Sequence, residues 1–169
     1  TEISPVTDRY LLGIDNGGTV AKAALFGLDG REWAVASRKT ELVSPKIGWA
    51  EFDAERLWEA TAGAVRQVIV ESGIAPSDIV VVSCTGHGNG LYLLDDQGLP
   101  VRNAIFSSDA RAQPIVDRWA AEGIDRVPRP KTMQALWPGP PTALPAWLLE
   151  HAAETVNRAR WVCRCDDFV

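Results

Sequence analysis

The segment GIDNGGTVAKAALFGLDG, residues 13–30, decides the fold of this chain. An apolar run over residues 10–14 leads into Asp15, a turn follows at residues 16–18, and β-branched and apolar residues resume over 19–26. Two such runs around a glycine-rich turn predict a β-hairpin. A mixed sheet can be built outward from this hairpin, because the flanking patterns supply further strands and a helix.

The pattern after the hairpin changes twice. Residues 31–40 alternate as a third antiparallel strand, and residues 53–72 place apolar side chains at helical spacing, with Asp53 as the N-cap. Residues 79–84 are continuously apolar, which is typical of a strand buried on both faces. A further hairpin strand is expected at 91–95. The order β-β-β-α-β predicts an α/β fold with a mixed β-sheet and flanking helices.

The remainder is predicted to be mainly helical. A helix follows Asp109 and stops near Gly123, residues 128–145 are broken by prolines into loop or short helical turns, and one last helix spans Leu144–Arg158 before a short strand at 161–163. We expect the side chains of Trp49 and Trp58 to lie in the core, because tryptophan in such positions more often packs than binds a ligand.

Composition limits the function classes. The chain has 169 residues, 46% hydrophobic, and a net charge of −5 without a basic run, which disfavours nucleic acid and anionic membranes as partners but not a nucleotide. The three cysteines, Cys84, Cys163 and Cys165, are expected to be reduced. Residues 1–10 lack the order of a signal peptide and no apolar run is long enough to span a membrane, so a cytoplasmic protein is expected. Its oligomeric state stays open, with a homo-oligomer as one option.

The turn after Asp15 carries chemistry that suits phosphate. Glycines at 17 and 18 permit positive φ and let oxygens approach backbone N–H groups, and Thr19 adds a hydroxyl. A carboxylate here would repel phosphate unless it holds a hydrated Mg²⁺. Lys22 lies on the next strand. The alternative is an ordinary hairpin with a surface ion pair between Asp15 and Lys22.

Three motifs in order resemble a known family. The Asp15 turn, at the start of a β-β-β-α order, resembles the first phosphate motif of the actin-like ATPases. GWAEFDAERLWEA (48–60) and GHGNGLYLLDDQGLPVRNAIFSSDARA (86–112) resemble the Gly-Trp-x-Glu segment and the substrate loop of the FGGY carbohydrate kinases. Within that family the Asp-Asn-Gly-Gly turn, the Ser107-Ser108-Asp109 triplet and LWPGPP (136–141) are most similar to the L-xylulose kinase branch.

The resemblance implies an actin-like, ribonuclease H-like ATPase fold, of which residues 1–169 form part of the first of two such domains, the C-terminal domain being absent. It implies ATP and Mg²⁺ as cofactors, with Asp15 beside the metal, Gly17, Gly18 and Thr19 facing the γ-phosphate, and Lys22 at a position often basic. The substrate residues it implies are His87, Gly88, Asn89, Ser108 and Asp109.

Two departures bear on the substrate. Asn89 stands where a sugar-contacting histidine is common, and Ser107-Ser108-Asp109 replaces a Trp-Asn-Asp triplet, which removes an apolar wall. His87 could instead be a loop histidine, and Asp109 could cap the helix that follows.

The function implied is phosphorylation of a hydroxyl on a small-molecule sugar, a ketopentose such as L-xylulose. The aspartate that serves as base in the family is expected beyond Val169, so we expect residues 1–169 alone to be inactive. The alternative is a non-catalytic sugar-binding or regulatory module on the same fold.

Overall fold

A computed structural model describes residues 9–169, with the side chain of Asp125 left aside. The chain divides into two compact units. The first contains the residues up to Thr40, residues 56–86 and Val169, and the second contains residues 41–55 and 87–168. Residues 1–8, on which the expected absence of a signal peptide largely rests, lie outside the described part of the chain.

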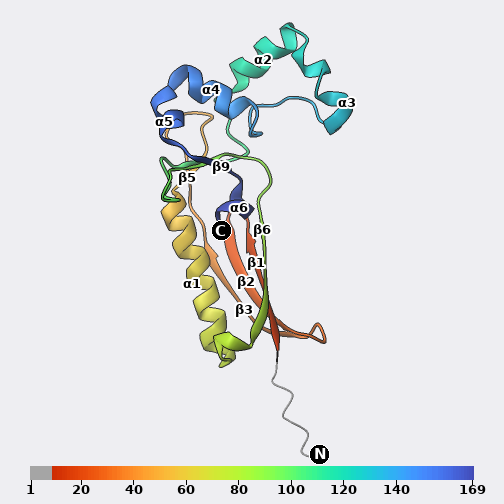
Figure 1. The fold of residues 1–169 in the computed structure, drawn as a ribbon, viewed down its shortest axis with the longest axis vertical. Helices are drawn as coiled ribbons and strands as arrows, with labels where there is room; N and C mark the ends of the chain where they lie inside the picture. Colours follow the sequence, from red (N-terminus) through yellow and green to blue (C-terminus); the bar gives the residue numbers. More distant parts are fainter. Residues whose placement is uncertain (1–8) are drawn as a thin grey trace, which may run out of the picture. The chain divides into compact units, whose positions relative to one another are not determined.

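The first unit is built on a four-stranded mixed sheet (Figure 1). Strands β1 (Tyr10–Asn16), β2 (Val20–Gly27) and β3 (Glu32–Lys39) are antiparallel neighbours, and β6 (Ile79–Gly86) pairs with β1 in parallel. The spatial order is β3-β2-β1-β6. The predicted order of strands and the mixed direction of the sheet are confirmed.

Helix α1 (Ala54–Ser72) covers one face of this sheet. Its buried side chains recur three and four residues apart, at Leu57, Thr61, Ala64 and Val68, which is the stripe of a helix packed on one side. Facing them are small and aliphatic residues of the three antiparallel strands, among them Leu12, Ala23, Leu25 and Ala36. The small alanines let the helix approach the sheet closely.

A buried hydrogen bond joins helix and sheet in the same layer. The Thr61 hydroxyl lies 2.6 Å from Oδ1 of Asn16, whose side chain is fully buried at the end of β1. A polar group at such depth is stabilised only when it is hydrogen-bonded, so this pair also fixes how α1 lies along β1.

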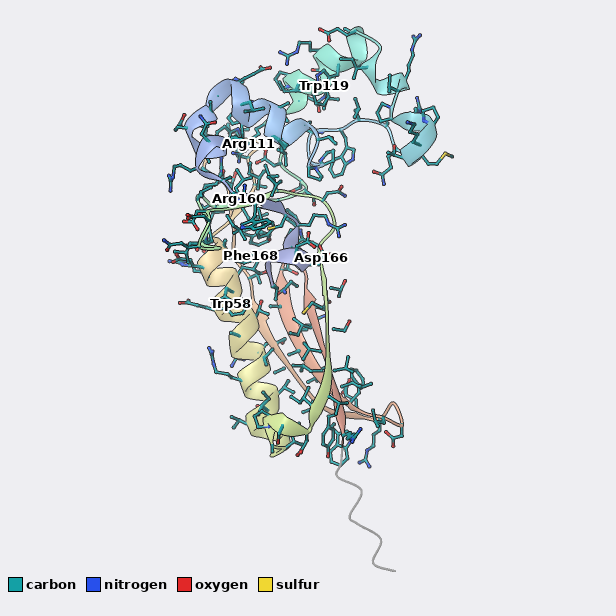
Figure 2. All side chains as sticks on the ribbon, viewed as in Figure 1. Trp58, Arg111, Trp119, Arg160, Asp166 and Phe168 are labelled. Atoms are coloured by element: carbon teal, nitrogen blue, oxygen red, sulfur yellow. The ribbon has the colours of Figure 1, made fainter. Side chains whose placement is uncertain are left out.

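Two predictions about burial are wrong for one reason. Val80, Val81 and Val82 of β6 are 45%, 52% and 56% exposed, so the strand is not buried on both faces. The side chain of Trp58 is half exposed and projects from α1 (Figure 2). Within the described residues of this unit, one helix covers one sheet face, and β6 is an edge strand. An apolar side chain that does not point into the layer between helix and sheet therefore stays exposed.

The second unit consists of short elements. Its strands form two small antiparallel sheets, ordered β4-β5-β8 and β7-β9, and a helical part follows them. The strands are β4 (Leu42–Val43), β5 (Glu51–Phe52), β7 (Tyr92–Leu94), β8 (Ala104–Ile105) and β9 (Trp161–Cys163). The helices are α2 (Gln113–Ala121), α3 (Arg129–Thr132), α4 (Ala143–His151), α5 (Ala153–Arg158) and α6 (Cys165–Phe168), and short 3₁₀ turns are η1 (Pro76–Asp78, in the first unit) and η2 (Ile124–Arg126).

One core serves this second unit. Aliphatic side chains of β7, β8, α2 and α4 pack together, among them Leu93, Ile105, Ile115, Leu144 and Leu148. The single last helix predicted over Leu144–Arg158 is instead two helices, because Ala152 leaves the helical region at φ −155° and ψ 50°. The strand at 161–163 is confirmed.

In the described part of the chain, every helix is too short or too polar to cross a lipid bilayer.

Gly63 lies inside α1, where glycine is costly. A Cβ there would meet the side chain of Arg38 at an ordinary 3.7 Å, and the backbone is helical. Gly63→Ala is therefore expected to raise the free energy of unfolding by about 0.5–1 kcal/mol, because alanine restricts the unfolded chain more. Urea titration measures the change.

The matched control is Gly73, at the end of the same helix. Its φ of +69° lies in the left-handed region, where a Cβ is strained, so Gly73→Ala should lower stability. A loss at Gly63 as large as that at Gly73 would contradict the assignment.

Candidate functional site

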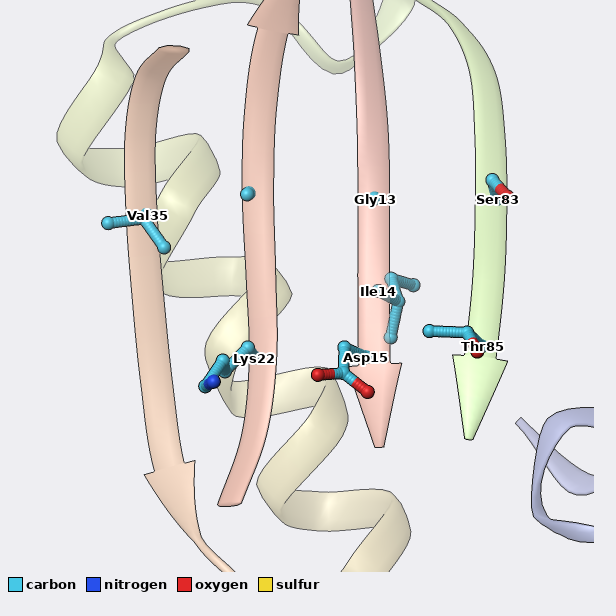
Figure 3. A pocket seen from close by; sticks show the side chains of 8 residues that line it. Gly13, Ile14, Asp15, Lys22, Val35, Ser83 and Thr85 are labelled. Atoms are coloured by element: carbon cyan, nitrogen blue, oxygen red, sulfur yellow. The ribbon is translucent and has the colours of Figure 1, made fainter. Parts of the chain in front are cut away.

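The face of the sheet opposite α1 carries a row of small side chains. Cross-strand pairing aligns Val35, Ala24, Gly13 and Ser83 across β3, β2, β1 and β6. These residues floor an open depression of about 290 Å³ (Figure 3). Because Gly13 and Ala24 have almost no side chain, the middle of the sheet is accessible from this side.

A second row of polar side chains lies two residues further along the same strands. Asp15 pairs directly with Lys22 on β2 and with Thr85 on the parallel strand β6, and all three line the depression. The carboxyl ends of β1 and β6 meet here, so a carboxylate and a hydroxyl come together from residues 70 positions apart. Sequence reasoning missed Thr85, whose only signal is its place directly after an apolar run.

The alternative of a surface ion pair is not borne out. Asp15 and Lys22 are opposite each other in register and both are exposed, but among the residues the structure describes no ion pair joins them. Their carboxylate and ammonium groups are both accessible on one face of the sheet (Figure 3).

The predicted glycine turn differs in one detail. Gly17 and Gly18 would permit positive φ, but neither residue adopts it. The turn is closed by the Gly17 N–H, which donates to the Val20 carbonyl at 3.0 Å, and a Cβ on Gly17 would stand 3.0 Å from that same oxygen. Glycine is needed for the close approach rather than for φ. Thr19 is exposed in this turn.

The carboxylate of Asp15 fits a hydrated Mg²⁺ rather than a protein-caged metal. Mg²⁺ keeps several waters and is bound by one or two carboxylates together with substrate phosphates. In the described part of the chain, no cluster of three or more histidine, cysteine, aspartate or glutamate side chains could hold a metal. The exposed Asp15 carboxylate, beside Thr85, is suited to a Mg²⁺ site that is completed by water and the substrate phosphates.

In the second unit, His87 is enclosed by aromatic rings. Its imidazole stacks on Phe52 with centroids 5.6 Å apart, meets the edge of Phe106 at 4.7 Å, and has Nε2 2.9 Å from the Tyr92 hydroxyl. Burial lowers the pKa of His87, and the nearby Asp166 carboxylate opposes that shift. The ring is therefore held in place and neutral near pH 7, which differs from a loop histidine without partners.

The other nitrogen of this ring is not used by the chain. Nδ1 of His87 is buried and has no hydrogen-bond partner among the described residues. Leaving a buried polar atom unpaired costs about 1–3 kcal/mol. Such an atom, in a ring whose other nitrogen is fixed, is a candidate contact for a polar ligand.

The turn after His87 is tight and reaches a distant loop. Asn89 and Gly90 both have positive φ, 62° and 78°, and the Gly90 N–H donates to the Gly139 carbonyl at 3.0 Å. Gly88 and Ser108 are exposed. A Cβ on Gly139 would stand 1.8 Å from the Ser107 carbonyl oxygen, so the LWPGPP loop lies against both segments predicted to bind sugar.

Asp109 has a different surrounding from the one expected. It is fully buried, and its two oxygens accept four hydrogen bonds, from the backbone of Ala50 (2.6 Å) and Arg111 (2.8 Å) and twice from the Arg111 guanidinium (2.8 Å each). Four bonds fill the lone pairs of a carboxylate, so none remains for a sugar hydroxyl. It does not cap α2 either, since that helix begins at Gln113.

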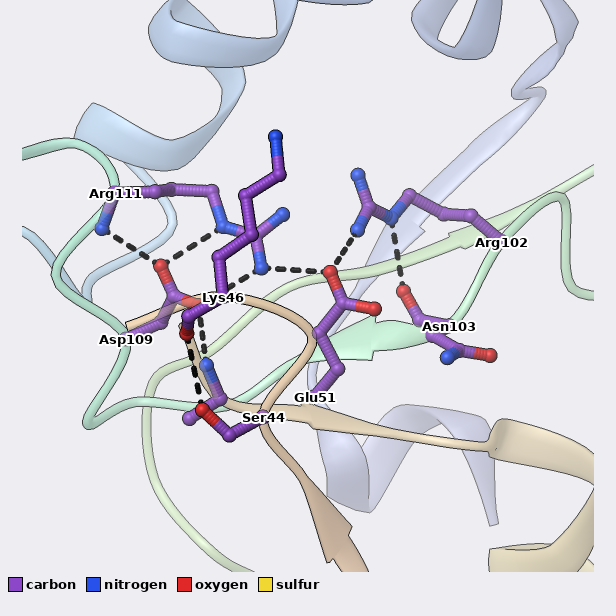
Figure 4. A network of polar contacts seen from close by, with 8 residues as sticks. Ser44, Lys46, Glu51, Arg102, Asn103, Asp109 and Arg111 are labelled. Carbon is purple, nitrogen blue, oxygen red and sulfur yellow. Dashed lines mark hydrogen bonds and ion pairs between the residues drawn. The ribbon is translucent and has the colours of Figure 1, made fainter. Parts of the chain in front are cut away.

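Arg111 is the centre of a buried ionic network (Figure 4). Its side chain is fully buried, and Nη2 bonds Glu51 at 2.6 Å as well as Asp109, while Glu51 also pairs with Arg102. Two acids and two bases balance, so the network as a whole is neutral.

The Trp49 side chain closes one side of this network. The guanidinium carbon of Arg111 lies 3.8 Å from the Trp49 ring centroid, and Trp147 meets Trp49 edge-on at 5.4 Å. Trp49 is half-buried and packs against a charge, outside the buried core of this unit, so its predicted place in the core is wrong. Sequence reasoning missed Arg111 and Glu51 as its partners.

The network is expected to stabilise the second unit strongly. Asp109→Ala leaves the buried Arg111 charge without its bidentate partner, which costs about 3–5 kcal/mol. Chemical denaturation measures the loss. The control is Glu150→Ala, which removes the exposed partner of Arg118 and should hardly move the midpoint, since solvent screens that pair. Equal effects of the two variants would contradict the buried network.

The lowered pKa of His87 makes stability depend on pH. The unfolded chain binds this proton near the ordinary value of 6.5, and the folded chain only at lower pH. The unfolded state therefore holds more protons between those values, and the free energy of unfolding falls as the pH drops through 6.5 toward the lower pKa of the folded state. In His87→Phe this part of the slope should vanish; an unchanged slope would show that His87 titrates normally.

Comparison with known proteins agrees with these features. The model of the FGGY family of carbohydrate kinases, N-terminal domain, matches residues 10–169. The L-xylulose/3-keto-L-gulonate kinase of Escherichia coli is 39% identical over 161 residues, covering 95% of this chain and 32% of that protein. The probable L-xylulose kinase of Pasteurella multocida is 36% identical, with 95% and 33% covered.

A solved structure shows the same fold. The xylulose kinase from Rhodospirillum rubrum superposes with a TM-score of 0.85 at 30% identity, covering 95% of this chain and 33% of that one. The chain thus spans about a third of the length of the relatives it matches. With the family model matching nearly its whole length, the chain belongs to the FGGY family of carbohydrate kinases.

Proposed function

We propose that the protein containing this chain transfers the γ-phosphoryl group of ATP to a hydroxyl of a ketopentose such as L-xylulose. The observation that carries the proposal is the polar row of Asp15, Lys22 and Thr85 on the open face of the sheet, a constellation that sugar binding alone does not need. Two relatives at 39% and 36% identity are named for L-xylulose.

The first unit would serve the phosphate side. Phosphoryl transfer asks a protein mainly for positioning and charge neutralisation. The Asp15 carboxylate, with Thr85 beside it, would hold the hydrated Mg²⁺, and Lys22 would add a positive charge. Gly17, Gly18 and Thr19 would offer N–H and hydroxyl donors to phosphate oxygens. Bound Mg²⁺ would neutralise charge on the phosphate oxygens during transfer.

The second unit would bind the sugar. His87, Asn89 and Ser108 supply donors and acceptors for hydroxyl groups, on a turn with Gly88 whose backbone is fixed by positive φ and by the Gly139 contact. Asp109 would hold these loops through its four internal bonds instead of contacting the substrate. The catalytic base would come from the remainder of the protein, and consumption of ATP fits action in the cytoplasm.

The second candidate is a non-catalytic sugar-binding module. Asp15, Thr19 and Lys22 speak against it, because sugar recognition needs none of these three. The two functions differ in one measurable property: a kinase releases ADP in the presence of its sugar, and a binding module does not.

Replacing Asp15 tests the proposal in the full-length protein. With Mg²⁺-ATP and a panel of pentuloses and pentitols, ADP release should be stimulated by one sugar. Asp15→Ala should lower kcat by about a hundredfold or more while sugar affinity by calorimetry stays within about a factor of three, since the carboxylate acts on the phosphate side.

The matched control is Asp29→Ala, which removes another exposed aspartate of the first unit, bonded only to the Arg31 backbone within its own turn. It should leave kcat unchanged. Sugar binding with no turnover in the unaltered protein would favour the binding module.

A further inference from the structure

Tyr92 is placed to control the imidazole of His87. It lies in β7, where it pairs with Cys163 of β9, its side chain is 1% exposed, and its ring stacks on Phe168 at 5.2 Å. The hydroxyl stands 2.9 Å from His87 Nε2. A buried strand residue whose ring stacks on another has little freedom, so the hydroxyl is a fixed partner for the imidazole.

The direction of this hydrogen bond follows from the chemistry of the groups present. The Tyr92 hydroxyl lies 2.9 Å from His87 Nε2, and the Cys165 thiol is close enough to affect its pKa. A phenol O–H is a stronger donor than the N–H of a neutral imidazole, and an imidazole nitrogen is a much stronger acceptor than a phenol oxygen or a sulfur atom. Tyr92 therefore donates to Nε2. Burial first, and then the Cys165 thiol, raise the pKa of Tyr92, so the phenol keeps its proton.

The proton of the neutral ring must then lie on the other nitrogen. An imidazole whose Nε2 accepts has its single proton on Nδ1. The rings of Phe52 and Phe106 flank the imidazole, and neither can accept that proton as a conventional partner. Nδ1 is the buried nitrogen without a partner among the described residues, so its N–H is available to donate to a ligand.

We infer that Tyr92 is a positioning residue, which fixes the His87 ring as the Nδ1–H tautomer so that this N–H donates to an oxygen of the sugar. The inference rests on the proposed function for the identity of the ligand, but not for the tautomer. A histidine that merely fills a core would be expected to satisfy both nitrogens.

The tautomer is measured first, without turnover. In the ¹⁵N-histidine-labelled full-length protein, long-range ¹H–¹⁵N correlations distinguish Nδ1–H from Nε2–H, and His87 is assigned by loss of its signals in His87→Phe. His151 gives an internal reference, because its Nδ1 lies 2.9 Å from the Trp147 carbonyl and must donate to it. We expect the Nδ1–H pattern for His87, and a mixture of tautomers in Tyr92→Phe. An Nε2–H pattern in the unaltered protein would overturn the inference.

Kinetics then test the contact with sugar. Tyr92→Phe keeps the ring and should raise KM for the sugar about tenfold, with kcat within about twofold and KM for ATP unchanged, as for loss of one ground-state hydrogen bond. The control is Tyr10→Phe, at the only other tyrosine, in the core of the first unit, which should move none of these values. Equal sugar KM in Tyr92→Phe and the unaltered protein would contradict a positioning role.

A second pair of variants separates donation from packing. The amide nitrogen of asparagine can stand near the position of Nδ1, so His87→Asn should recover part of the sugar affinity that His87→Phe loses. Equal loss in both would mean that the ring only packs. If the unaltered protein phosphorylates no sugar of the panel, the proposed function fails, whereas the NMR pattern still decides whether Tyr92 sets the tautomer.

Discussion

The register of β1 is the constraint on which the first unit depends. Side chains alternate along a strand, so a slip of one residue would send Leu12 to the open face and Asp15 toward α1. Two neighbours hold this register at once, β2 antiparallel and β6 parallel, and the buried bond between Asn16 and Thr61 holds it from the helix side. The same alternation that buries the core therefore delivers the polar row to the open face.

In the second unit, buried charges hold the segments in place. Its strands of two or three residues are too short to fix loops by pairing alone. The buried Asp109 carboxylate instead ties the loop at Ala50 to the segment at Arg111, and Glu51 extends the tie to Arg102. Such a network stabilises the fold only when all its members are present, because removing one side chain leaves a buried charge without its partner. Its geometry is correspondingly specific.

Local pattern predicted the first unit well, and long-range partners explain what it missed. Strand order, α1 and the polar turn follow from period and turn chemistry. The exposure of Val81 and the role of Asp109 do not, because both depend on what lies opposite in space. An aspartate two residues before an arginine gives the same local pattern whether it binds sugar, caps a helix or forms a buried ion pair. The break at Ala152 likewise has no proline or glycine to announce it.

Among the candidate sugar-binding residues, too, local features could be predicted from the sequence and long-range contacts could not. Asn89 could be foreseen as a turn residue, since asparagine tolerates the left-handed region. The aromatic enclosure of His87 could not be foreseen, because Phe52 and Tyr92 come from β5 and β7 and Phe106 is the residue after β8. Phe52 and Phe106 lie 54 positions apart in the sequence, yet all three rings meet at one imidazole. The backbone turn after His87 places the residue, but it does not set the orientation of the imidazole. The surrounding rings hold the imidazole, and the Tyr92 hydroxyl sets the direction of its hydrogen bond to a sugar oxygen.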